Sequence, residues 1–351
     1  MKNNFDKRLD NLPVSIWQKV AQIDELKGQW VAGVKLGPRV LGRLKKSVLV
    51  TSTGASTRIE GSKLSDEEVE KVMRGILIKK FSDRDKQEIQ GYYELLANVF
   101  ESFGSLKLTE NLIKHFHQEL LKYVDKDQRH RGEYKKQENK VLMINKAGES
   151  AGVLFETSSV LLTPKEMLDL VWWTGEAFRK EIYHPLLLVG NFVASFLKIH
   201  PFTDGNGRLS RILTNLLMLK SGYDYMPYIS HEKLIEDQKI DYYLALRQSQ
   251  KTFGTKKESL EAWLEFFLEI VYQQTQLALE LLSGENMEKL LSLTQLKVWE
   301  YIQEKGEVTP RELAGKLGIV RATVNQVLSK LIRLKKIERL GLGRGTYYRE
   351  A

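Results

Sequence analysis

Apolar side chains recur every three or four residues along most of this chain, a period typical of α-helices that bury one face. The clearest such stretches cover residues 14–31, 39–60, 85–102, 109–123, 185–199, 208–220 and 256–282. Strand patterns are scarce, and the short apolar runs 141–144 and 152–155 predict a single β-hairpin. The sequence therefore predicts a mainly α-helical protein.

The composition of the 351 residues is that of a globular protein, with 42% hydrophobic and 28% charged residues. The absence of cysteine excludes disulfides, cysteine-ligated zinc and thiol catalysis. The first residues lack the apolar segment of a signal peptide, and the apolar run 186–199 is too short to span a bilayer. We therefore expect a cytoplasmic protein with no membrane partner.

The net charge of +9 is concentrated at the C-terminal end. Residues 285–351 contain thirteen basic and eight acidic residues, and residues 320–351 contain eight basic and two acidic ones. A basic end of this kind indicates a nucleic-acid partner. A merely solvated surface is the alternative, and the charge alone favours that alternative.

The most informative stretch is His200–Arg211, which reads His-Pro-Phe-Thr-Asp-Gly-Asn-Gly-Arg-Leu-Ser-Arg. One apolar helix runs up to His200 and ends at Pro201, and another helix follows, so Gly205-Asn206-Gly207 is predicted to be a tight loop before a helix N-terminus. Free N–H groups and the helix dipole attract anions there. Arg208 and Arg211 lie on one face of this helix near its N-terminus, where the dipole disfavours basic residues. A polyanion bound between them would explain this placement.

Two further residues of the stretch suit chemistry on phosphates. Asp204 supplies the single carboxylate that commonly holds Mg²⁺ beside phosphate oxygens. His200 is suited to act as a general base. The alternatives are a capping or packing histidine, an ordinary turn, or a fortuitous metal pair. The stretch is neither a P-loop nor a Rossmann turn, because no Lys-Ser/Thr follows the glycines and a helix precedes them.

The whole stretch resembles the motif of Fic (Fido) domain proteins at every specified position. The resemblance implies a Fic-type helical core with a β-hairpin flap. It also implies Mg²⁺-dependent transfer of AMP from ATP to a Tyr, Thr or Ser hydroxyl of a target protein. By the same resemblance His200 is the base and Asp204 holds Mg²⁺, while the phosphates are held by Gly205, Asn206, Gly207 and Arg208 and, at the γ-phosphate, by Arg211.

Residues Ser56–Gly61 resemble the inhibitory motif of the same family. Ser56 and Glu60 share a helix face, and Glu60 lies in the last helical turn, where the dipole disfavours an acid. The resemblance implies that Glu60 pairs with Arg211 and so inhibits the enzyme. An isolated glutamate in this position would instead be a solvated surface residue.

Two other resemblances to the family rest on less specific patterns. The flap strand is expected to contain Val153, Leu154, Phe155 and Glu156, and its exact register is left open. The stretch that packs on adenine and ribose is expected to include Tyr242, Tyr243 and Gln250. Adjacent tyrosines are otherwise ordinary core or surface residues.

The C-terminal end resembles a winged helix-turn-helix. Helices are expected over 309–318 and 321–330, followed by a two-stranded wing over 335–340 and 346–349. Four residues of the second helix are able to read DNA bases: Arg321, Thr323, Asn325 and Gln326. Winged helices also serve as protein-binding or dimerisation modules, so a homodimer is also expected.

These observations predict an N-terminal helical extension (1–84), a Fic core (85–282) and a winged helix (286–351). The leading hypothesis is a protein adenylyltransferase that uses ATP and Mg²⁺ and is autoinhibited by Glu60. One alternative is removal of AMP by the same site. The other is a DNA-binding regulator whose Fic domain senses nucleotide.

Overall fold

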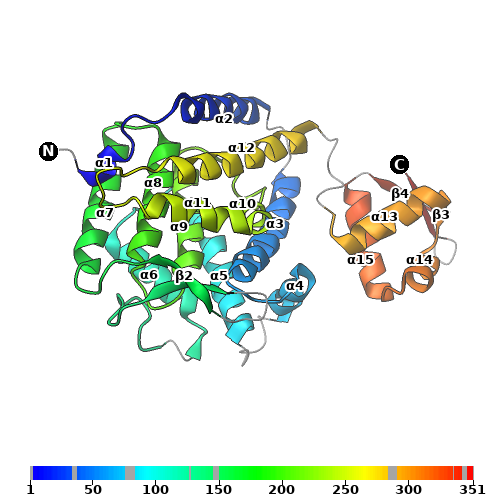
Figure 1. The fold of residues 1–351 in the computed structure, drawn as a ribbon. Helices are drawn as coiled ribbons and strands as arrows, with labels where there is room; N and C mark the ends of the chain where they lie inside the picture. The colour runs from blue at the N-terminus through cyan, green and yellow to red at the C-terminus, as the bar shows by residue number, and fades with distance from the viewer. Residues whose placement is uncertain are drawn as a thin grey trace. The chain divides into compact units, whose positions relative to one another are not determined.

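The structure is a computed structural model, and it describes residues 3–33, 38–75, 84–125, 128–144, 150–283, 291–334, 336–341 and 346–350. The chain divides into two compact units, Met1–Leu279 and Glu280–Ala351. Both are mainly helical (Figure 1), which confirms the predicted fold class. No helix in the described part of the chain is long and apolar enough to cross a membrane.

The first unit consists of helices and one hairpin. In chain order these are α1 (Asn4–Lys7), α2 (Val14–Gly33), α3 (Pro38–Ile59), α4 (Asp66–Gly75), α5 (Arg84–Ser102), α6 (Glu110–Leu121), β1 (Lys140–Ile144), β2 (Ser150–Glu156), α7 (Thr163–Arg179), α8 (Pro185–Ile199), α9 (Asn206–Lys220), α10 (His231–Asp237), α11 (Lys239–Gln250) and α12 (Glu261–Ser283), whose last turn belongs to the second unit.

The core of this unit is built around α8 and α9. Every residue of α8 except its first and Lys198 is buried, and α9 is buried nearly as completely. A helix that is apolar on all sides must be surrounded by other helices, and α8 packs against both α7 and α9. The His200–Arg211 stretch, which runs from the end of α8 into the first turns of α9, is therefore held by the best-packed part of the molecule.

Helix α3 forms one wall of the core and packs against α5 and α10 (Figure 1). The second half of this helix buries several small residues, among them Ser52, Ala55 and Ser56. Ser52 Oγ donates a hydrogen bond to Ser230 Oγ at 2.8 Å. Small side chains let neighbouring helices approach closely, so the end of α3 is fixed relative to the core.

The predicted hairpin is present as the antiparallel pair β1–β2. Its register pairs Lys140 with Glu156 and Ile144 with Ser150, and it shifts between Val141 and Leu142 and again between Met143 and Ile144. The expected turn between the strands lies outside the described residues. The structure describes the backbone of this hairpin and not its side chains.

The second unit is a winged helix-turn-helix. It contains α13 (Leu293–Lys305), β3 (Glu307–Val308), α14 (Pro310–Leu317), α15 (Arg321–Arg333), β4 (Ile337–Leu340) and β5 (Tyr347–Glu350). The sheet has the order β3-β5-β4, so a third, very short strand joins the predicted two-stranded wing. Its core includes Trp299, Leu313, Val324 and Leu328.

Candidate active site

The backbone of the His200–Arg211 stretch is fixed by its own side chains. His200 ends α8 in the left-handed conformation, with φ 51° and ψ 60°. Asn206 folds back onto Phe202, since its Oδ1 accepts from the Phe202 N–H at 2.9 Å and its Nδ2 donates to the Phe202 carbonyl at 2.8 Å. Gly205, with φ 78°, is the N-cap of α9. The segment between the helices is thus a closed loop.

Helix α9 begins at Asn206, and not after Gly207 as the sequence predicted. The loop is closed by the Asn206 side chain, so the Asn206 backbone is able to adopt the helical conformation. The first turn of α9 therefore contains Asn206, Gly207 and Arg208, and its N–H groups point out of the helix end, where the dipole favours an anion.

His200 is a neutral imidazole of defined tautomer. Its Nδ1 lies 3.3 Å from the Leu197 carbonyl oxygen, and since a carbonyl only accepts, Nδ1 bears the hydrogen. The lone pair is then on Nε2. Burial lowers the pKa of His200 to about 4, an effect that the nearby Lys135 reinforces and that Glu60 and Asp204 oppose. At neutral pH the ring is therefore able to accept a proton.

Arg211 is held by two residues at the end of α3. Its Nη2 lies 2.7 Å from Glu60 Oε1 and 2.9 Å from the Ser56 carbonyl oxygen, and its Nε donates to Ser56 Oγ at 2.8 Å. Burial acts to lower the pKa of Arg211, but Glu60, Tyr242 and Tyr92 together raise it overall. The structure thus brings together Ser56, Glu60 and Arg211, while Gly61 follows α3 with φ 106°.

The Glu60 carboxylate also contacts the first turn of α9. A Cβ atom placed on Gly207 would collide with Glu60 Oε1 and would lie 3.4 Å from Arg211 Nη1. The carboxylate therefore occupies space at the anion-attracting end of α9, beside the arginine that is buried there.

Four charged residues form a closed ring of alternating sign, which we call the charge ring. The ion pairs join Arg84 to Glu88 (2.8 Å), Glu88 to Arg208 (2.6 Å), Arg208 to Asp204 (3.2 Å) and Asp204 to Arg84 (2.7 Å). Burial raises the pKa of Glu88 despite the neighbouring Arg208. Burial also acts to raise the pKa of Asp204, but Arg208, the Gly205 N–H and Arg84 lower it overall, so this residue is a carboxylate.

Three residues that surround this loop were not predicted from the sequence. Arg84 and Glu88, both on α5, complete the charge ring. His117 on α6 stacks on Phe202 with 3.9 Å between ring centroids, and its Nε2 lies 3.0 Å from the Asp204 carbonyl oxygen. Each is a single polar residue in an amphipathic helix, which from sequence alone is indistinguishable from a solvated one.

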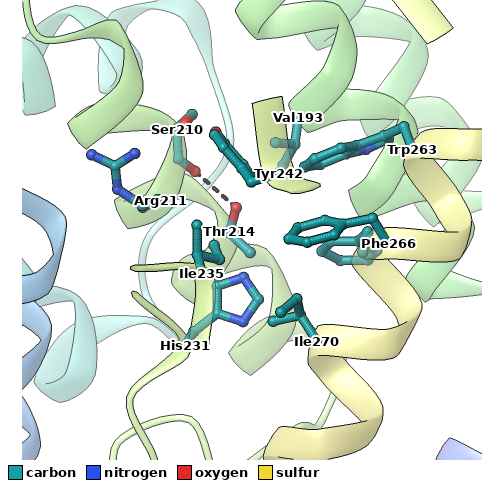
Figure 2. Close-up of a pocket in the computed structure, with 11 residues that line it drawn as sticks. Val193, Ser210, Arg211, Thr214, His231, Ile235, Tyr242, Trp263, Phe266 and Ile270 are labelled. Atoms are coloured by element: carbon teal, nitrogen blue, oxygen red, sulfur yellow. Dashed lines mark hydrogen bonds between the residues drawn. The ribbon is translucent and has the colours of Figure 1, made fainter. Parts of the chain in front are cut away.

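The residues expected to contact adenine and ribose lie in different surroundings. Tyr242 is buried between Ser210 and Trp263 (Figure 2), beside a cavity of about 10 Å³, which is too small for a nucleotide. Tyr243 is half-buried, and burial together with Glu60 raises its pKa well above the ordinary value. The Gln250 side chain is buried and donates to the Ala194 carbonyl at 2.8 Å.

The other predicted residues are placed as follows. Val153, Leu154, Phe155 and Glu156 belong to β2, the strand that α11 approaches, but their side chains lie outside the description. On α15, Val324, Val327 and Leu328 are buried, whereas the four residues expected to read DNA, Arg321, Thr323, Asn325 and Gln326, are exposed. The exposed face of α15 is therefore available for a partner.

Comparison with known proteins gives two matches to family models. The Fic/DOC family model matches residues 107–218, and a model described as winged helix-turn-helix DNA-binding matches residues 291–338. The first match contains the His200–Arg211 loop, and the second contains most of the second unit.

Similar proteins support the same assignment. A probable protein adenylyltransferase of Aquifex aeolicus is 24% identical over 295 residues, which cover 82% of each chain. Protein adenylyltransferase fic-1 of Caenorhabditis elegans is 46% identical over 82 residues, only 15% of its length. A solved structure of a Fic family protein from Desulfovibrio desulfuricans G20 has a TM-score of 0.63 at 22% identity, with 97% of both chains covered. At this sequence identity, the structural similarity shows a shared fold.

Proposed function

The chain carries a Fic/DOC domain and a C-terminal winged helix-turn-helix, and from this premise we propose that it is a protein adenylyltransferase. It would transfer AMP from ATP to a hydroxyl side chain of a target protein. The activity named for the similar proteins of Aquifex aeolicus and Caenorhabditis elegans supports the reaction class. The complete His200–Arg211 loop supports it in this chain.

In the proposed reaction His200 is the general base. Its Nε2 lone pair takes the proton of the target hydroxyl, whose oxygen attacks the α-phosphorus of ATP. The bond from that phosphorus to the bridging oxygen breaks, and pyrophosphate leaves. The first turn of α9, with Arg208 and Arg211, would offset the negative charge of the phosphates. Asn206 keeps this turn in place through Phe202.

The residues present fit a magnesium ion bound together with ATP. Asp204 is an ionised, part-exposed carboxylate at the anion-attracting end of α9, and no group of three His, Cys, Asp or Glu residues suited to a metal occurs in the described ranges. One carboxylate with phosphate oxygens and waters is a common Mg²⁺ site. When bound, the ion would neutralise charge on the phosphates.

Autoinhibition by Glu60 is part of the proposal, and one observation carries it. The Glu60 carboxylate pairs with the buried Arg211 at 2.7 Å and lies against Gly207 in the first turn of α9. A triphosphate held by the same turn and the same arginine would compete with this carboxylate. Nucleotide would therefore bind poorly, or in an unproductive position, while Glu60 stays in place.

The test compares the wild type with Glu60→Gln in the presence of Mg²⁺ and ATP labelled on the α-phosphate. Intact-mass analysis detects AMP added to the protein itself. We expect strong labelling in Glu60→Gln, little in the wild type, and none in Glu60→Gln combined with His200→Ala. Glu70→Gln removes an acid that is 51% exposed and should behave as the wild type.

Absence of labelling in Glu60→Gln, with folding and ATP binding verified, would contradict adenylyl transfer. The wild type would then be incubated with an AMP-modified protein. Release of AMP would instead identify the removal reaction.

A second function is proposed for the winged helix. We infer that α15 binds DNA, because Arg321, Thr323, Asn325 and Gln326 are all exposed on it. The excess of basic residues in 320–351 supports the same inference.

A further inference from the structure

Lys135 holds the backbone on both sides of His200. It lies in the segment before β1, and only 3% of it is exposed. Its backbone N–H donates to the Pro201 carbonyl at 2.8 Å, and its ammonium donates to the Ile199 carbonyl at 3.0 Å. The residues before and after the proposed base are thus anchored to the same lysine.

The same ammonium contacts both ends of the β1–β2 hairpin. Nζ lies 2.6 Å from the Ser158 carbonyl oxygen, 2.9 Å from Asn139 Oδ1 and 3.1 Å from Thr157 Oγ1. Asn139 directly precedes β1 and Thr157 directly follows β2. The base of the hairpin is therefore joined to the His200 loop through one side chain.

Asn139 adds a second connection between the hairpin and the loop. Its Nδ2 donates to the Phe202 carbonyl at 3.0 Å, and the Thr157 hydroxyl donates to the Asn139 carbonyl at 2.7 Å. We call Lys135, Asn139 and Thr157 the Lys135 cluster. It makes the position of the hairpin dependent on the position of His200.

The four side-chain contacts of Lys135 are all to uncharged oxygen atoms. Burying an ammonium among carbonyl, amide and hydroxyl groups is costly, and burial lowers the pKa of Lys135 to about 8, although Glu138 and Glu166 act to raise it. The same positive charge acts to lower the pKa of His200.

We propose that Lys135 is a positioning residue of the active site, which fixes the His200 loop relative to the base of the hairpin and places a positive charge beside that loop. This inference rests on the proposed function of His200 as a base. Three charged groups influence that ring: Lys135 from the segment before β1, Glu60 from the end of α3 and Asp204 from the loop before α9. Of these, only Lys135 disfavours the protonated imidazole.

The decisive variant is Lys135→Met, which keeps the length of the side chain and removes its charge. The pKa of His200 is measured in the full chain by NMR, with its ring signal assigned from its loss in His200→Ala. Because a positive charge is removed while Glu60 and Asp204 remain, the pKa of His200 should rise by roughly one unit. Lys135→Arg should restore most of the wild-type value. Lys136→Met, which changes a neighbour that is 77% exposed, is the matched control.

A second readout is transfer of AMP in the Glu60→Gln background. Lys135→Met should lower kcat at least tenfold and leave the KM for ATP unchanged, because the cluster contacts the base and not the first turn of α9. In the pH–rate profile, the fall of the rate at acidic pH should begin at a higher pH than in the wild type, because the pKa of His200 is raised. An unchanged His200 titration in folded Lys135→Met would overturn the inference.

The two readouts separate this inference from the proposed function. If no variant transfers AMP, the proposed function fails, yet the NMR titration still tests the effect of Lys135 on His200. Should Lys135→Met fail to fold, Thr157→Val removes one neutral partner from the cluster. It should then slow transfer without affecting the KM for ATP, and an unchanged rate would overturn the link between hairpin and base.

Discussion

Glu60 Oε1 lies so close to the Cα of Gly207 that any side chain at position 207 would collide with it. The absence of a Cβ there admits the carboxylate to the first turn of α9 and to Arg211. A phosphate group would need the same access, since it seeks the same N–H groups and the same guanidinium. The glycine therefore serves the proposed inhibited arrangement as well as the proposed substrate complex.

Gly207→Ala should destabilise the protein only when Glu60 is present. In the wild type the new methyl group displaces the carboxylate from the buried Arg211, at a cost of about 1–3 kcal/mol. In a Glu60→Ala background the collision is absent, and alanine should stabilise α9 by up to about 1 kcal/mol. Urea unfolding of the four proteins measures both effects. An equal effect in the two backgrounds would show that Glu60 does not occupy this space in solution.

Glu88→Gln should destabilise the protein strongly. The Arg208 side chain is only 3% exposed, and its positive charge is compensated by Glu88 and Asp204. Loss of one partner of a buried ion pair costs about 3 kcal/mol. Glu70→Gln breaks an exposed pair with Arg74 and should cost below about 0.5 kcal/mol. Chemical denaturation compares the two variants, and similar losses would contradict the charge ring as a stabilising element.

Acid should destabilise the protein through His117. Burial lowers its pKa to about 4, and its Nδ1 accepts the Gly132 N–H at 2.8 Å, which only the neutral ring allows. The unfolded chain binds this proton near pH 6.5, so stability is lost as the pH falls from about 6.5 to 4, by up to about 1.4 kcal/mol per pH unit.

Urea unfolding at pH 7, 6 and 5 measures this slope. His117→Gln should be less stable at pH 7 and should show a shallower slope, although His200 and His231, whose pKa values are also lowered by burial, add to it. His115→Gln changes an exposed residue on the same helix and is the matched control. A slope unaffected by His117→Gln would refute the explanation.

The full chain should bind duplex DNA with an affinity that falls steeply as salt concentration rises. If Arg321 reads a base, Arg321→Ala should weaken binding by about 1–3 kcal/mol. If Arg321 contacts a phosphate, the substitution should reduce the slope of log affinity against log salt concentration by about one. Lys305→Ala, an exposed change at the end of α13, should have a smaller effect. Fluorescence anisotropy with labelled DNA measures all three proteins. Salt-independent binding would favour a protein partner.

Most of the helices were predictable from the sequence because apolar periodicity is a local property, whereas α10 and α11 were not predicted. The start of α9 was not, since Gly-Asn-Gly is typical of a turn and nothing in the pattern shows that Asn206 closes the loop on Phe202. The short strand β3 was missed for a related reason, because two residues carry no period and pair only through contact with β5.

The residues of the candidate site also separate into those that the sequence predicts and those that it does not. His200, Asp204, Arg208 and Arg211 are consecutive parts of one motif, so their proximity follows from the sequence, and a second motif supplied Glu60. Other residues reach the loop only through tertiary packing: Arg84 and Glu88 on α5, His117 on α6, and Lys135 before β1. No spacing rule connects such residues to the motif.

The burial of α3 has a consequence for how the proposed inhibition would be relieved. The helix that ends beside Glu60 is also a wall of the core, with Ser52, Ala55, Ser56 and Ile59 facing inward. A truncated chain beginning near residue 107, where the family match starts, would lose this wall along with Glu60. Such a deletion would remove the Glu60 carboxylate and destabilise the fold at the same time. If Glu60 inhibits the enzyme as proposed, an activating signal that preserves the fold has to move the Glu60 side chain while α3 stays packed.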